Sequence, residues 1–285
     1  MTEQGMLYLC ATPIGNLSDM TFRVLDTLKE VDLIACEDTR NSMKLLNHFE
    51  IKTPLTSYHE YNKYDKADEL VRQLLSGKNI ALITDAGTCG ISDPGEVLVQ
   101  KCQEAGIVVT SLPGACALIT ALSMSGLPTR RFCFEAFLPA EKKERAQILE
   151  ELKSETRTII LYEAPHHLVK TLKELSDALG NREIALCREL TKRFEEVKRT
   201  TLEDALLFYK EHEPKGEYVL VVKAKELEDI KKEAIEDWLS ISMEEHMSYY
   251  ENQGLDRKEC MRKVAKDRGI SKRDVYQYFL SSLNL

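Results

Sequence analysis

The sequence has no closely spaced cysteine pair and no long apolar run, and both absences narrow the class of protein. Cys89 and Cys102, the closest of its eight cysteines, are 13 positions apart, so no CxxC pair is available to a zinc site. Most of the cysteines lie in apolar segments, which is typical of buried free thiols in a reducing compartment. No apolar stretch approaches about 20 residues, and no basic segment precedes the short apolar run near the N-terminus. We therefore expect a cytoplasmic protein with no membrane span, no signal peptide and no bound metal.

Acidic residues outnumber basic ones, and the common phosphate-binding motifs are missing. The 285 residues include 39 Lys and Arg against 47 Asp and Glu, which gives a formal net charge of −8. This balance argues against a surface that is basic throughout, although it leaves room for a local basic patch that contacts nucleic acid. Neither GxGxxG nor the P-loop pattern is present, so the glycine spacing predicts neither a dinucleotide nor ATP. The length and the 43% of hydrophobic residues favour a globular chain of two domains with a small appendage.

Short apolar runs alternate with amphipathic segments in the first part of the chain. This pattern predicts strands at 7–11, 33–36, 80–84 and 107–112, and helices at 65–76 and 94–105. Gly77 and Gly106 follow the two helices, and glycine commonly ends a helix. Such alternation predicts an α/β fold of right-handed βαβ units around a mainly parallel sheet, with ligands bound by the loops after the strands.

A Pro-Gly turn at 113–114 separates this set of elements from a second one. In the second set, strands are expected at 132–137, 158–162, 183–188 and 218–223, and helices at 141–153 and 167–179. The tail has no strand signal, and its capping residues Ser242, Asp256 and Ser271 indicate three helices. We therefore predict an N-terminal α/β domain at 1–114, a second α/β domain at 115–225 and a helical segment at 226–285.

Three loops rich in small residues, at 12–17, 85–95 and 113–117, follow predicted strands. Small residues let a ligand approach the backbone closely, and free amides at a helix start can hold a carboxylate. Any one loop is explained as well by an ordinary tight turn, but three of them at strand ends favour a ligand cleft. Polar clusters at 37–40, 57–62, 163–167 and 188–193 follow strands or a linker, and solvated loop charge explains a single cluster equally well.

Seven segments in chain order make the sequence similar to the ribosomal RNA small subunit methyltransferase I family, within the tetrapyrrole-methylase superfamily. They cover roughly residues 6 to 223 and are Thr12-Pro13-Ile14-Gly15-Asn16-Leu17, Glu37-Asp38-Thr39-Arg40, Asp85-Ala86-Gly87-Thr88, Ser92-Asp93-Pro94-Gly95, Pro113-Gly114, Tyr162-Glu163-Ala164-Pro165-His166 and Arg188-Glu189-Leu190-Thr191-Lys192. The tail segment 271–276 resembles the helical C-terminal part of that family. The sequence departs from the family pattern at Cys89, where Pro is expected, at Cys116, where Ser or Thr is expected, and at Tyr61, where His is expected.

The resemblance implies a class III methyltransferase of two α/β domains with S-adenosylmethionine in the cleft between them. It also implies methylation of a cytidine ribose 2′-hydroxyl in small-subunit (16S) ribosomal RNA, with free RNA or the 30S subunit as partner, by a homodimer. Ala86, Gly87 and Ile91 are expected at the methionine end of the cofactor, with Cys116 and Ala117 nearby. Tyr162 and Glu163 are expected at the nucleoside end. The expected cofactor-binding set also includes Pro13, Gly15 and Asp85.

A ribose hydroxyl is a poor nucleophile at neutral pH, so a base or a cation must assist its attack on the methyl group. Base candidates are Glu37, Asp38 and Glu163, whereas Arg40 and Arg188 could hold a phosphate or orient a carboxylate. Two other functions stay open on the residues alone. One is an enzyme of the same fold that methylates a tetrapyrrole or another small molecule, and the other is a non-catalytic RNA-binding factor.

The charge of the tail is polarised along its length. Residues 256–274 include eight basic and four acidic side chains, a balance of +4, whereas residues 226–251 include two basic and nine acidic ones, a balance of −7. The basic stretch predicts a contact with RNA phosphates, and an ordinary solvated helical face is the alternative. The basic residues are Arg257, Lys258, Arg262, Lys263, Lys266, Arg268, Lys272 and Arg273.

Overall fold

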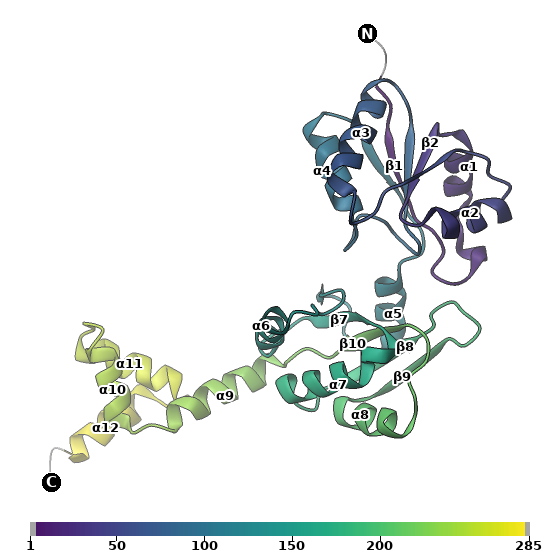
Figure 1. Ribbon diagram of the computed structural model, residues 1–285. Helices are drawn as coiled ribbons and strands as arrows, with labels where there is room; N and C mark the ends of the chain where they lie inside the picture. Colours follow the sequence, from purple (N-terminus) through teal and green to yellow (C-terminus); the bar gives the residue numbers. More distant parts are fainter. Residues whose placement is uncertain (1–3, 283–285) are drawn as a thin grey trace. The chain divides into compact units, whose positions relative to one another are not determined.

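The computed structural model describes residues 4–282, which divide into two compact units (Figure 1). The first unit consists of the chain up to Glu150 together with Thr158–Lys223, and it contains two five-stranded sheets. The second unit consists of Glu151–Arg157 and the chain from Ala224 onward. None of the helices in residues 4–282 has the length and apolarity needed to cross a membrane.

The first sheet is parallel throughout, which confirms the prediction for this part of the chain. Its strands lie in the order β3-β2-β4-β1-β5, with β1 pairing Leu7 to Ile80 on one side and to Val109 on the other. The strands are β1 (Leu7–Cys10), β2 (Leu33–Cys36), β3 (Leu55–Ser57), β4 (Ile80–Ile83) and β5 (Val109–Leu112). All four residues of β4 are buried, as expected for a central parallel strand covered on both faces.

Helices cover both faces of this sheet (Figure 1). Successive residues of a strand point to opposite faces, so each strand contributes side chains to both cores. Ile80 and Leu82 belong to the core beneath α3 and α4, whereas Ala81 and Ile83 belong to the core beneath α1 and α2. The elements between the strands are η1 (Leu17–Asp19), α1 (Phe22–Glu30), α2 (Thr39–His48), α3 (Lys63–Leu75) and α4 (Gly95–Glu104). Every strand of the sheet therefore ends in a loop at the same edge.

The second sheet is mixed rather than parallel, in the order β6-β7-β10-β8-β9. Only β6 and β7 pair in parallel, and the other neighbours are antiparallel. Its elements are α5 (Ala117–Ser125), β6 (Phe132–Phe134), α6 (Lys142–Leu152), β7 (Thr158–Glu163), α7 (Pro165–Leu179), β8 (Glu183–Arg188), β9 (Glu196–Thr201), α8 (Leu202–Glu211) and β10 (Tyr218–Val222). The sequence did not predict β9, whose segment Glu-Val-Lys-Arg-Thr-Thr is polar and contains no buried residue because it forms an edge.

The second unit contains four helices among its described residues, not the three that the sequence predicts. They are α9 (Leu227–Leu239), α10 (Met243–Glu251), α11 (Arg257–Asp267) and α12 (Lys272–Ser282). The capping box at Ser242 and the caps at Asp256 and Ser271 are confirmed. The additional helix, α9, has no side-chain N-cap bond and no buried residue, so neither of the usual signals marks it in the sequence.

A polar cluster joins α9 to the small core of the second unit. The rings of Trp238 and His246 are stacked with centroids 3.8 Å apart. Arg268 donates from Nε to His246 Nδ1 (3.1 Å) and from Nη2 to the carbonyls of Ile241 and Ser242 (2.7 Å each). Arg268 is buried, so this member of the basic stretch stabilises the fold and is not free to contact a phosphate.

Candidate active site

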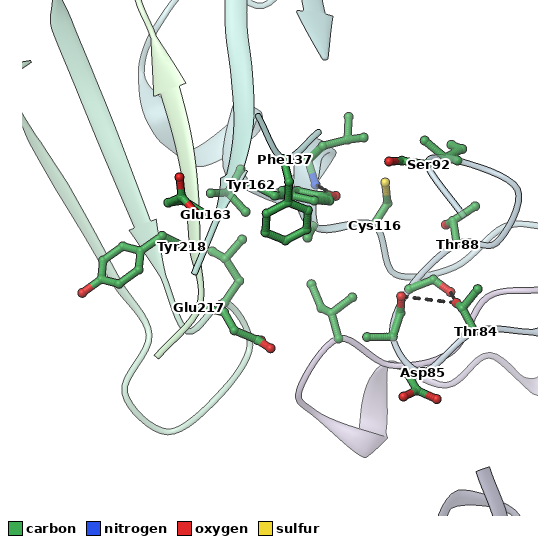
Figure 2. Close-up of a pocket in the computed structure, with 18 of the residues that line it drawn as sticks. Thr84, Asp85, Thr88, Ser92, Cys116, Phe137, Tyr162, Glu163, Glu217 and Tyr218 are labelled. Atoms are coloured by element: carbon green, nitrogen blue, oxygen red, sulfur yellow. Dashed lines mark hydrogen bonds between the residues drawn. The ribbon is translucent and has the colours of Figure 1, made fainter. Parts of the chain in front are cut away.

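A pocket of about 480 Å³ lies in the first unit, where loops from both sheets meet. Figure 2 shows Thr84, Asp85 and Thr88 on one side and Phe137, Tyr162 and Glu217 on the other. Its volume is in the range of small-molecule sites, and its walls include the apolar side chains of Ile14, Leu118 and Leu190. Within residues 4–282, no group of three or more His, Cys, Asp or Glu side chains could hold a metal ion. The pocket therefore offers apolar walls, backbone groups and a few acidic side chains.

The three glycine-rich loops predicted from the sequence are joined to one another beside this pocket. Thr12 and Gly87 exchange two backbone hydrogen bonds (2.9 and 3.0 Å), and Thr88 Oγ1 donates to the carbonyl of Ala115 (3.0 Å). Gly87 has φ of +83°, and a Cβ there would lie 3.2 Å from Cγ2 of Ile14. Glycine is thus required at this position both by the backbone conformation and by the close packing.

Asp93 holds the loop between β4 and α4 in one conformation. Its carboxylate accepts hydrogen bonds from the amides of Gly90 (2.8 Å), Ile91 (3.2 Å) and Gly95 (2.7 Å). The buried hydroxyl of Tyr58 donates to the carbonyl of Pro94 (2.7 Å) and fixes the same loop from α3's side of the sheet. Ile91, an expected cofactor contact, is therefore presented to the pocket by a preformed loop.

An aromatic group forms the side of the pocket that belongs to the second sheet. Tyr162 accepts a hydrogen bond at its hydroxyl from the amide of Leu118 (3.2 Å), and the rings of Phe134 and Phe137 lie edge-on to it at 4.9 and 5.7 Å. Burial raises the pKa of Tyr162 to about 12, so its hydroxyl stays protonated at neutral pH. Cys116 is the N-cap of α5 but makes no side-chain capping bond, whereas Ser and Thr are preferred N-cap residues because their hydroxyls can accept one.

Glu37 is the base candidate whose surroundings favour proton abstraction. It lines the pocket at the end of β2, close to Asp85. Although Glu37 is exposed, the protein around its carboxyl group partly displaces water and raises its pKa, and the negative charges of Asp85 and Asp93 raise it further. A carboxylate with a raised pKa is a better general base than an ordinary surface carboxylate.

Asp38 and Arg40 do not line this pocket. Asp38 caps α2, accepting from the amide of Arg40 (2.8 Å), and its other oxygen is 2.8 Å from Arg40 Nη2. These hydrogen bonds lower the pKa of Asp38 to about 2, which makes it a weak base. The Arg40 side chain is 86% exposed. Arg188, the second cationic candidate, is also outside the lining and donates from Nε to the carbonyl of Lys215 (2.6 Å).

Glu163 lines the pocket, but its carboxylate is committed to hydrogen bonds inside the protein. One oxygen accepts from the amide of Ala164 (2.8 Å), and the other accepts from the hydroxyl of Thr171. Thr171 in turn accepts from Nη2 of the buried Arg145 (2.6 Å), which also pairs with Glu174 (2.6 Å). This arrangement suits a residue that positions the wall of the pocket better than one that takes up a proton.

The predicted cofactor-binding residues divide between two pockets. Ala86, Gly87, Ile91, Cys116, Ala117, Tyr162 and Glu163 line the larger one, Pro13 and Gly15 line a second one of about 150 Å³, and Asp85 lines both. Among the other lining residues, Ile14 and Leu190 lie in segments that the sequence marks as candidates, whereas Leu118, Phe137, Glu217 and Tyr218 do not. Glu217 and Tyr218 lie at the start of β10, which runs antiparallel to its neighbours β7 and β8, so its first residues reach the pocket and a pattern of polar residues after strands does not indicate them.

Comparisons with known proteins define the class. Residues 6–206 match the family model of the tetrapyrrole (corrin/porphyrin) methylases. A diphthine synthase has the same fold with a TM-score of 0.63 at 15% identity, over 78% of this chain and 90% of that one. So does a uroporphyrin-III C-methyltransferase from Thermus thermophilus complexed with S-adenosyl homocysteine, with a TM-score of 0.54 at 16% identity, over 77% and 97% of the two chains. The fold is thus that of the tetrapyrrole methylases.

Relatives with much higher identity identify the family more closely. The ribosomal RNA small subunit methyltransferase I of Halalkalibacterium halodurans is 49% identical over 277 residues, which cover 97% of this chain and 95% of the relative. The protein of the same name from Bacillus subtilis is 46% identical over 278 residues, or 98% and 95%. This chain belongs to the ribosomal RNA small subunit methyltransferase I family. The resemblance inferred from the seven sequence segments is confirmed.

Proposed function

We propose that this protein transfers a methyl group from S-adenosylmethionine to the ribose 2′-hydroxyl of a cytidine in small-subunit (16S) ribosomal RNA. The observation that carries the proposal is the 49% identity, over nearly the whole chain, to a relative that bears the name of a ribosomal RNA methyltransferase. The pocket at the loops of both sheets supports it, because its volume and its apolar and backbone lining suit a nucleoside-containing cofactor.

The lining residues suggest how the cofactor is held. The backbone of Ala86 and Gly87 and the side chain of Ile91 would contact the methionine end, near Cys116 and Ala117 at the start of α5. The Tyr162 ring and the Glu163 backbone would contact the nucleoside end. S-adenosylmethionine supplies a methyl group that is already activated on a sulfonium, so the protein has to align the attacking oxygen behind it.

Glu37 is the base that we favour for the ribose hydroxyl. It lines the pocket, and its raised pKa improves its basicity, whereas Asp38 is a helix cap with a lowered pKa and Glu163 is held by Thr171. Arg40, which is exposed and paired with Asp38, is better placed to meet a phosphate at the surface than to act on the reacting atoms.

Further parts of the proposal concern the assembly. We propose that the protein acts in the cytoplasm as a homodimer on 16S ribosomal RNA or on the 30S subunit. We also propose that residues 1–114 and 115–225 form two α/β domains and that the helical segment 226–285 contributes RNA contacts. The exposed side chains of Arg257, Lys258, Arg262, Lys266, Lys272 and Arg273 support the last point.

The decisive experiment measures transfer of a labelled methyl group to 30S subunits, free 16S RNA and tetrapyrroles such as uroporphyrin III. We expect label in the RNA of one or both ribosomal substrates, and mapping should find it on the 2′-oxygen of a cytidine. Methylation of the tetrapyrrole alone would favour the small-molecule enzyme. An absence of S-adenosylmethionine binding in calorimetry would favour a non-catalytic RNA-binding factor.

A further inference from the structure

The second, smaller pocket adjoins the larger one and belongs entirely to the first sheet and its loops. It has a volume of about 150 Å³ and lies between the loop after β1, the first half of α2 and the end of β4. Thr84 and Asp85 line both pockets, so the two cavities share a wall. A group that reacts in the larger pocket therefore has a place beside it for a covalently attached neighbour.

Three polar side chains in this second pocket have capacity for a ligand. Asn41 Nδ2 donates to Asp85 Oδ2 (3.2 Å), which leaves the other carboxylate oxygen and the other amide hydrogen available. Ser42 is 4% exposed, and its Oγ has no hydrogen-bond partner among the described residues. The neighbouring Cys36 thiol donates to the carbonyl of Thr56 and offers the Ser42 hydroxyl only its sulfur, which is a weak acceptor. A buried hydroxyl without a partner is uncommon in folded proteins and points to a ligand.

The remaining lining restricts the chemistry of that ligand. Pro13, Leu17 and Leu45 provide apolar surface, and the pocket has no lysine, arginine or histidine in its lining. A carboxylate without a cation disfavours an anionic group such as a phosphate and favours a neutral group with an N–H donor. The ligand should therefore be small, flat or apolar on its faces, and able both to donate and to accept hydrogen bonds at its edge.

We propose that this pocket holds the cytosine base of the target nucleotide and distinguishes it from uracil, an inference that rests on the proposed function. The cytosine N4 amino group would donate to Asp85, as acidic side chains commonly accept from this group. The N3 and O2 acceptors would receive hydrogen bonds from the Asn41 amide and the Ser42 hydroxyl. Uracil presents O4 in place of the amino group, so it would set an acceptor against the Asp85 carboxylate.

The shared wall makes this placement compatible with the reaction. The base is attached to C1′ of the ribose and the reacting hydroxyl to C2′, so a base in the small pocket puts the 2′-oxygen at the junction of the two cavities. Asp85 lines both cavities at this junction, and Glu37 lines the larger pocket close to Asp85. The nucleotide must leave its stack to enter, as is usual when proteins read the Watson–Crick edge of single-stranded RNA.

The test uses 30S subunits in which the mapped target nucleotide is either cytidine or uridine. Single-turnover methylation at saturating S-adenosylmethionine would be compared for the wild type and for Asp85→Asn, Asn41→Asp and Ser42→Ala. We expect the wild type to prefer cytidine by 100-fold or more, and Asp85→Asn to narrow that ratio at least tenfold because a carboxamide can donate to O4. Ser42→Ala should slow reaction with cytidine about three- to tenfold. Ser76→Ala, in the same domain but outside both pockets, is the control and should change neither value.

The outcomes separate this inference from the proposed function. If the wild-type protein methylates no ribosomal substrate, the proposed function itself fails. If it methylates the cytidine and all three pocket variants keep the wild-type rate and the wild-type ratio, only the cytosine pocket is overturned. Because Asp85 also lines the larger pocket, the S-adenosylmethionine affinity of Asp85→Asn must be measured. If that affinity falls, the test of the cytosine pocket rests on Asn41→Asp and Ser42→Ala, because Asn41 and Ser42 line only the smaller pocket.

Discussion

Thr12 and Gly87 are paired by two backbone hydrogen bonds of 2.9 and 3.0 Å, although they are 75 positions apart in the sequence. This pair joins the loop after β1 to the loop after β4 and turns the backbone of Gly87 into part of the pocket wall. The side-chain hydroxyl of Thr12 adds a third bond, to the carbonyl of Thr84 (3.1 Å). These three bonds hold the wall together without any ligand, and such preorganisation lowers the entropic cost of binding.

Replacing Gly87 by valine should therefore weaken S-adenosylmethionine binding at least tenfold, or about 1.4 kcal/mol. The new side chain would strain a backbone with φ of +83° and would meet Ile14 and the carbonyl of Ala115 at the pocket. Titration calorimetry measures the affinity. Gly106→Val is the matched control, because Gly106 also has a positive φ (+70°) but lies outside the pocket and has open space around its Cβ position. Equal affinities in the wild type and a folded Gly87→Val protein would remove this loop from the cofactor site.

The raised pKa of Glu37 predicts how the rate depends on pH. A base acts only when deprotonated, so kcat/KM should fall as pH decreases through the raised pKa of Glu37. Glu37→Gln removes the titrating group and should lower the rate on the order of 10²–10⁴-fold while S-adenosylmethionine still binds. The variant should also lose the acidic limb of the pH profile.

Asp38→Asn serves as the comparison for Glu37. The hydrogen bonds from Arg40 hold the pKa of Asp38 at about 2, so Asp38 is already ionised throughout the working range. Its replacement should lower thermal stability through the weakened cap of α2 and keep the acidic limb of the profile. A Glu37→Gln enzyme with a near-wild-type single-turnover rate would show that another group, or solvent, takes the proton.

Much of the first sheet could be predicted from the sequence because its strands are continuous apolar runs. The segment Ile80–Ile83 is buried on both faces, and glycines end the helices that flank it. The second sheet was harder, because an edge strand such as Glu196–Thr201 buries no side chain and leaves no hydrophobic pattern. The helix Leu227–Leu239 was missed for the same reason.

The candidate site was predictable at the level of loops but not of side-chain roles. Small residues after strands predicted ligand-binding loops at Gly87 and Cys116, and both residues line the pocket. The sequence could not distinguish Glu37 from Asp38, since only the folded chain shows that one lines the pocket and the other caps a helix. It also could not assign Arg268, whose burial beside His246 depends on tertiary packing.

The burial of His246 leads us to expect that the second unit loses stability in mild acid. Its imidazole is buried, stacked on Trp238 and faced by Arg268 at Nδ1, Asp267 at Nε2 (3.4 Å) and the ring of Tyr250. Burial lowers the pKa of His246, the Arg268 charge lowers it further, and Asp267 partly opposes the shift. The unfolded chain therefore binds the proton more readily, so stability should fall as pH decreases below about 6.5 toward the lowered pKa.

The single tryptophan makes this loss measurable, because Trp238 fluorescence reports on the second unit alone. Thermal unfolding followed at Trp238 should shift to lower temperature between pH 7 and pH 5. His246→Phe keeps an aromatic ring against Trp238 but cannot titrate, and its transition should depend less on pH. A wild-type transition that is constant over this range would contradict the assignment of His246.

The basic face of the second unit, by which we mean the basic side chains of α11 and α12, should contribute to RNA affinity through phosphate contacts. Arg262, on α11, is 70% exposed and pairs only loosely with Glu259 (3.8 Å), so its charge is available to a phosphate. Replacing Arg262, Lys263, Lys266 and Arg273 by Gln should weaken binding to 30S subunits or 16S RNA and flatten its salt dependence. The expected change in slope is about 0.7 for each phosphate no longer neutralised on a single strand.

A comparison of two double variants, each of which removes two positive charges, distinguishes the contribution of the basic face from a general effect of lost positive charge. The pair Arg262→Gln and Lys263→Gln removes two charges from α11, and the pair Lys231→Gln and Lys232→Gln removes two from α9, where acidic residues dominate. Only the first pair should reduce RNA affinity and the salt slope, and neither should change S-adenosylmethionine affinity, because all pocket residues lie in the first unit. Equal effects of the two pairs would indicate nonspecific attraction.

Unchanged affinity in the fourfold variant would exclude this face as an RNA contact. The next candidates would then be the basic side chains in and near β9, which are Lys192, Arg193, Lys198 and Arg199.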